Sequence, residues 1–71
     1  MPMSVTFTAV LHREGKLYVA YCPEAGTASQ GSTIHAAVAN LREATELYLE
    51  EFPRTKSDTP IITTFAAAVN A

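Results

Sequence analysis

Two short segments near the start of the chain alternate apolar and polar residues. They cover residues 5–12 and 16–22, and both are rich in β-branched and aromatic side chains. A period of two is typical of a strand that buries one face. Between them, Glu14 and Gly15 can form a two-residue loop, with Gly15 in the positive-φ conformation that primed turns require. The pattern predicts a β-hairpin.

Pairing Arg13 with Lys16 across that loop fixes which side chains share a face of the hairpin. The face expected to line the core holds Val5, Phe7, Ala9, Leu11, Tyr18, Ala20 and Cys22. The opposite face mixes apolar and polar residues and is too apolar for a purely solvated surface. We expect this mixed face to form a homo-oligomer interface through Val10, Leu17, Val19 and Tyr21.

The periodicity changes after a weak third strand predicted over residues 27–30. Gly31 marks a turn, and Ser32 or Thr33 is placed to cap the N-terminus of a helix. Apolar residues then recur at steps of three and four until Pro53 ends the pattern, which predicts an amphipathic helix of about 18 residues. Its stripe consists of Ile34, Val38, Leu41, Thr45, Tyr48 and Phe52, widened by Ala37, Ala44 and Leu49.

The remaining residues predict a last strand after a polar linker. The linker covers residues 54–60, the strand covers 61–65 (IITTF), and residues 66–71 are a candidate extension of it. The expected fold is therefore a single α+β domain over residues 1–71 in the order βββαβ. A helix between the third and fourth strands favours a parallel crossover, so we expect a four-stranded mixed sheet in the order 3-2-1-4 with the helix on one face.

The length, net charge and cysteine content of the chain restrict the classes of protein to which it can belong. A chain of 71 residues holds one domain and buries only about 60% of its unfolded surface, which favours a homo-oligomer. A net charge of -2 argues against a general nucleic-acid binder. The single Cys22 offers neither an internal disulfide nor a zinc site. Without a signal peptide or an apolar span in the sequence, we expect a cytoplasmic protein with no membrane contact.

Side chains suited to catalysis are few and form no recognisable set. His12 is expected at a strand end, His35 in the first helical turn and Cys22 on the core face. The sequence offers none of them an orienting or activating neighbour. We therefore expect no catalytic residues, no metal site, no cofactor and no enzymatic activity.

The second half of the predicted helix is acidic. One arginine, Arg42, stands among four glutamates, which gives a local charge of about −3, and acids near a helix C-terminus oppose the helix dipole. On a helical wheel Leu47 lies opposite the apolar stripe. This face is either a surface for a basic partner with an apolar pocket or an ordinary solvated face. The candidate partner-binding residues are Glu43, Glu46, Leu47, Glu50 and Glu51.

Three motifs in order along the chain resemble the HicB family of antitoxins. They are YVAYCPE at 18–24, SQG at 29–31 and the helix that ends in LREATELYLEE at 41–51. The resemblance covers most of the chain. It implies a truncated ribonuclease-H-like fold, and a partner of the HicA type: a small basic ribonuclease toxin of double-stranded-RNA-binding shape whose active site the antitoxin covers.

The chain departs from that family pattern in three respects. Residues 5–12 and 61–65 contain no Asp or Glu, so we expect no two-metal nuclease of the ribonuclease H type. HicB-like antitoxins usually continue into a DNA-binding segment, and because this chain ends at Ala71 we expect no direct DNA binding by it. The family's usual acids early in the helix are replaced by His35, Ala36 and Ala37. The alternative hypothesis is an orphan homo-oligomeric domain without a toxin.

Overall fold

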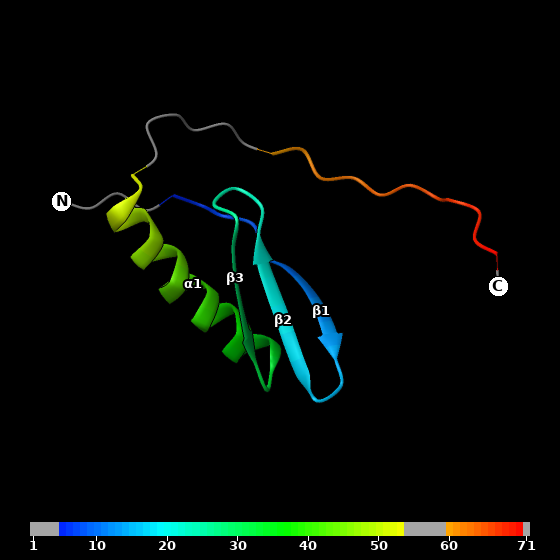
Figure 1. The fold of residues 1–71 in the computed structure, drawn as a ribbon, viewed down its shortest axis with the longest axis horizontal. Helices are drawn as coiled ribbons and strands as arrows, with labels where there is room; N and C mark the ends of the chain where they lie inside the picture. The colour runs from blue at the N-terminus through cyan, green and yellow to red at the C-terminus, as the bar shows by residue number, and fades with distance from the viewer. Residues whose placement is uncertain (1–4, 54–59, 71) are drawn as a thin grey trace.

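Three strands and one helix form the folded body of the part of the chain that the structure describes. The structure, a computed structural model, describes residues 5–53 and 60–70. Strands β1 (Val10–Glu14), β2 (Leu17–Cys22) and β3 (Thr27–Gly31) form an antiparallel sheet in the order β1-β2-β3, and helix α1 (Ile34–Glu51) follows. Figure 1 shows α1 alongside β3, with β1 at the far edge of the sheet.

The prediction of a four-stranded mixed sheet in the order 3-2-1-4 is wrong. Within the described residues the sheet has three strands and all pairing is antiparallel, so neither the βββαβ order nor the ribonuclease-H-like sheet is formed by this chain. Residues 60–70 run away from the sheet without regular secondary structure (Figure 1). High β propensity describes side chains that fit a half-buried sheet, and here that segment has no neighbouring strand to pair with. The predicted linker, apart from Pro60, lies outside the described residues.

The β1–β2 hairpin forms, but its register differs from the predicted one by two residues. Glu14 pairs with Leu17, so the loop is Gly15-Lys16 instead of Glu14-Gly15. Gly15, the first loop residue, has a φ of 61°, whereas Lys16, the second, does not have a positive φ. A positive φ at the first loop residue alone indicates a type II′ turn. Because the shift is an even number of residues, every side chain keeps its predicted face.

Strand β1 begins at Val10, well after the predicted start. The observed register, continued backwards, would place Thr8 opposite Pro23. Proline has no N–H to donate to a ladder, so strand pairing ends there. The backbone N–H of Thr8 is instead donated to the two carboxylate oxygens of Glu24, at 3.0 and 2.9 Å. A side chain thus replaces the missing strand partner.

The helix has the predicted length and position. It covers 18 residues, and Pro53 follows its C-terminal cap residue. Of the two candidate N-caps the structure selects Thr33 over Ser32: its Oγ1 accepts a hydrogen bond from the Ala36 N–H at 3.0 Å. This bond satisfies one of the N–H groups that have no partner inside the first turn.

The core between sheet and helix is small. The buried residues are Ala20, Cys22, Ala37, Leu41 and Thr45. The Thr45 hydroxyl exchanges a 2.7 Å hydrogen bond with that of Thr27, so the buried polar group is satisfied. Ile34 and Phe52, at the two ends of the predicted stripe, are 54% and 59% exposed. A helix of 18 residues is about 27 Å long and five-residue strands about 17 Å, so the sheet is shorter than α1, and the buried helix residues extend from Ala37 to Thr45.

Gly31 lets β3 approach the first turn of α1 closely. A Cβ at this position would lie 2.5 Å from the backbone nitrogen of Ala37, which no ordinary packing tolerates. Nearby, the Asn40 side-chain amide donates to the Gln30 carbonyl at 2.8 Å. The close contact and this hydrogen bond hold α1 against β3, which fixes the direction in which the rest of the helix points.

Candidate partner-binding surface

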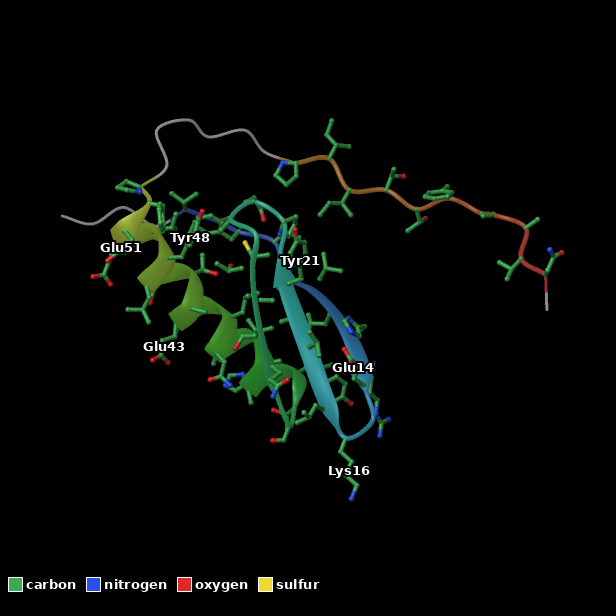
Figure 2. The ribbon with its side chains drawn as sticks, in the orientation of Figure 1. Glu14, Lys16, Tyr21, Glu43, Tyr48 and Glu51 are labelled. Carbon is green, nitrogen blue, oxygen red and sulfur yellow. The ribbon has the colours of Figure 1, made fainter. Side chains whose placement is uncertain are left out.

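The five residues predicted to bind a partner all lie on the exposed side of α1. Leu47 is 59% exposed and lies one turn from both Glu43 and Glu51. Figure 2 shows Glu43 and Glu51 pointing away from the sheet. The helix therefore brings the predicted residues together on one surface. We call this surface the acidic helix face; it consists of Glu43, Glu46, Leu47, Glu50 and Glu51.

Among the residues that the structure describes, no lysine or arginine forms an ion pair with a carboxylate of the acidic helix face. Among the described residues the ion pair present is that of His12 with Glu14, and Arg42 does not pair with Glu46 one turn later. The last turn of α1 contains no basic residue. Each acid at this end of a helix lowers helix stability by about 0.3–1 kcal/mol because it opposes the dipole. The repulsion between Glu46 and Glu50, one turn apart, lowers it by about a further 0.2–0.5 kcal/mol. The acidic helix face thus lowers the stability of the free protein.

The four residues predicted at an oligomer interface also share one surface. Val10 pairs with Tyr21 on the side of the sheet opposite α1, and Val19 and Leu17 follow Tyr21 at two-residue steps. Val10, Leu17 and Tyr21 are 45%, 38% and 45% exposed. We call this surface the outer sheet face; it consists of Val10, Leu17, Val19 and Tyr21. The two predicted surfaces therefore lie on opposite sides of the molecule.

Besides these two surfaces, the structure contains a cluster of hydrogen bonds around Glu24, a residue that the sequence pattern does not single out. In addition to the Thr8 N–H, the carboxylate accepts the Thr8 hydroxyl at 2.7 Å and the Cys22 thiol at 3.5 Å. Desolvation raises the pKa of Glu24, but the hydrogen bonds from the Thr8 hydroxyl, the backbone N–H groups of Thr8 and Glu24 and the Cys22 thiol together outweigh it, so the net pKa is lowered. The available signal was Pro23: an acid beside a ladder-ending proline can accept the N–H that the lost ladder leaves unpaired.

The three residues considered for catalysis lie in different surroundings. His12 is exposed on β1, and its Nε2 is 2.8 Å from the Glu14 carboxylate. His35 is exposed in the first turn of α1, whereas Cys22 is buried in the core with a free thiol. The structure does not assemble them into one site. In residues 5–53 and 60–70, no three His, Cys, Asp or Glu side chains are grouped in a way that could hold a metal ion.

The HicB-like motifs include two residues with a direct structural role. Glu24 of YVAYCPE holds the segment before β1, and Gly31 of SQG permits the contact between β3 and α1. In the described part of the chain, no helix is long and apolar enough to cross a membrane. The chain matches no protein-family model, no curated protein and no solved structure.

Proposed function

We propose that this chain is a HicB-like binding module of the cytoplasm that neutralises a small basic ribonuclease of the HicA type by covering its active site. The observation that carries the proposal is the acidic helix face. Four exposed carboxylates, which make no ion pair within residues 5–53 and 60–70, lie around an exposed leucine on one helix. The class of partner comes from the resemblance of the three sequence motifs to HicB antitoxins.

A basic partner with an apolar pocket would complement both the charge of this surface and its exposed leucine. The acids of the last two turns repel one another and oppose the helix dipole in the free protein. A cationic surface on a partner would attract these carboxylates and offset their mutual repulsion. Leu47, in the middle of the acids, offers an apolar anchor of the kind that fills a pocket at an interface centre. The protein acts by stoichiometric binding, with no chemistry of its own.

The first experiment co-expresses this chain with the small basic ribonuclease that the proposal expects to be encoded beside it. We expect the ribonuclease to arrest growth alone, the arrest to be relieved by this chain, and both proteins to elute as one complex in size-exclusion chromatography. A ribonuclease that stays toxic and elutes separately contradicts the proposal.

A charge reversal tests whether the acidic helix face is the surface used. Glu46→Lys should slow association about 10- to 100-fold at low salt, and much less at high salt, because electrostatic steering is screened. Glu14→Lys is the matched control, since it makes the same change of charge on the hairpin, away from α1. Equal effects of the two variants, or an effect independent of salt, would contradict a role for this face.

The outer sheet face favours a second candidate function, an orphan homo-oligomeric domain without a toxin. Three of its four side chains are exposed and Val19 is partly buried, at neighbouring positions of two strands, which is typical of a surface that meets another protein. Tyr21→Lys should then weaken self-association without affecting ribonuclease binding. A self-association that is lost in this variant, together with the absence of any ribonuclease complex, would favour the second candidate.

A further inference from the structure

We propose that residues 61–69 pair as a β-strand with the open edge of β1 in a second copy of the chain, so that two copies exchange their C-terminal segments. The proposal goes beyond the proposed function and does not depend on a toxin partner. It rests on the exposure and composition of residues 61–69, on the state of the β1 edge, and on the small core of the single chain.

Residues 61–69 have the side chains of a strand, but they pair with no strand among the described residues. Ile61, Phe65 and Val69 are 95%, 89% and 84% exposed. They are spaced by four residues, so an extended backbone places all three on the same side, with apolar or threonine side chains between them. The segment contains neither a charged residue nor a proline, and such segments associate through strand pairing when they are left exposed.

The two edges of the sheet differ. At the β3 edge, α1 lies alongside the strand, and the Gln30 carbonyl accepts a hydrogen bond from Asn40. At the other edge, β1 pairs with β2 alone within the described residues. A strand in that position presents a row of backbone N–H and C=O groups that can pair with a further strand. The β1 edge is therefore the acceptor that the sheet offers to residues 61–69.

The shape of the chain favours a second copy as the occupant. The Cα radius of gyration is 14.4 Å, whereas a compact domain of this length has about 11 Å, because residues 60–70 leave their own sheet (Figure 1). Each copy carries one segment and one edge. If both segments cross to the other copy, a twofold axis relates the two pairings and the assembly is closed, with each β1 edge covered.

The core of a single chain is small, so an added strand would contribute substantially to the buried apolar surface. Leu41 is the largest apolar side chain in the buried set, and the other apolar members are Ala20, Ala37 and Cys22. Phe7 and Leu11, on the helix side of the sheet, are only partly buried. A strand added beside β1 extends both faces of the sheet, so it enlarges the apolar surface removed from water.

Strand pairing of residues 61–69 predicts a dependence on individual backbone N–H groups, which non-specific hydrophobic association does not. In a strand added at an edge, alternate backbone N–H groups point toward the neighbouring strand and the others point to solvent. Proline removes one N–H and is tolerated only where that group is not used. Of Thr63→Pro and Thr64→Pro, one variant should therefore weaken dimerisation strongly and the other only slightly.

The first experiment measures the mass of the full chain by size-exclusion chromatography with light scattering over a dilution series. We expect a dimer for the natural sequence and for the controls Thr63→Ala and Thr64→Ala, which keep the N–H. One of the two proline variants should dimerise about 10- to 100-fold more weakly, as expected when a ladder hydrogen bond is lost. Circular dichroism should be unchanged in helix content, because residues 61–69 lie outside α1.

The second experiment locates the pairing. A copy with His12→Cys and a copy with Thr63→Cys or Thr64→Cys are co-expressed with different tags and oxidised. We expect a disulfide-linked product that carries both tags, whereas the natural chain, whose Cys22 is buried, should give none. A monomeric natural chain, equal weakening by both prolines, or a disulfide that forms only within one chain when both cysteines are present would overturn the proposal.

Discussion

Two groups of carboxylates in this protein are in opposite situations. Glu24 accepts hydrogen bonds from the Thr8 backbone, the Thr8 hydroxyl and the Cys22 thiol, and it is partly buried. The four glutamates of the acidic helix face are exposed and have no ion pair among the described residues. The first arrangement stabilises the fold, and the second costs stability. The acids that cost stability in the free protein are the ones that we propose a basic partner neutralises.

The largest predicted effect on folding comes from Glu24→Gln. The Thr8 N–H and hydroxyl would lose a charged acceptor, and the amide NH₂ group cannot accept in its place. We expect the free energy of unfolding in urea to fall by about 1–2 kcal/mol. Glu43→Gln, the same change on the acidic helix face, should alter it by less than about 0.5 kcal/mol. Equal losses in the two variants would remove the distinction between the two groups.

The lowered pKa of Glu24 makes a second prediction, with a definite sign. Because the folded pKa of Glu24 lies below its unfolded pKa, the unfolded chain takes up the proton first as the pH falls. The contribution of Glu24 to stability is therefore complete above the unfolded pKa and is lost as the pH falls through the folded pKa. Urea titrations at decreasing pH should show the stabilities of the natural chain and Glu24→Gln converging. A constant difference down to strong acid would contradict this assignment.

The helix and the acidic helix face could be predicted from the sequence because the information is local. The apolar spacing, a capping hydroxyl before Ile34 and Pro53 at the end specify α1 without reference to any other element. Once the helix is known, its period places Leu47 and the glutamates on the exposed side. The faces of the hairpin were predictable for the same reason, since they depend on a period of two.

The strand pairing was not predictable because it depends on what each strand meets. Both Glu14-Gly15 and Gly15-Lys16 can form a two-residue turn, and the choice between them moves the register by two residues. The start of β1 depends on Pro23 ending the ladder, which is visible only when the register is known. The residues IITTF have strand propensity, yet the structure provides no partner for them within the described chain.

A third prediction concerns the stability cost of the acidic helix face. Glu50→Lys removes the repulsion from Glu46, creates a favourable pair one turn apart, and places a cation at the C-terminal end of the helix dipole. We expect the free energy of unfolding at low salt to rise by about 0.5–1 kcal/mol, and the gain to shrink at high salt. Glu14→Lys should give no gain, because it loses the contact with His12. A Glu50→Lys chain that is less stable would mean that the carboxylate has a favourable role in the free protein.

The smallest predicted effect on folding is that of Leu47→Ala. Leu47 is 59% exposed, and alanine is at least as good a helix former, so the free energy of unfolding should change by less than about 0.5 kcal/mol. Binding of the proposed basic ribonuclease should nevertheless weaken about tenfold or more, because the proposed interface loses its apolar anchor. Leu17→Ala, on the outer sheet face, is the matched control and should leave that binding unchanged. Isothermal titration at high salt isolates the apolar contribution, and unchanged binding by Leu47→Ala under those conditions would reduce the acidic helix face to its charges alone.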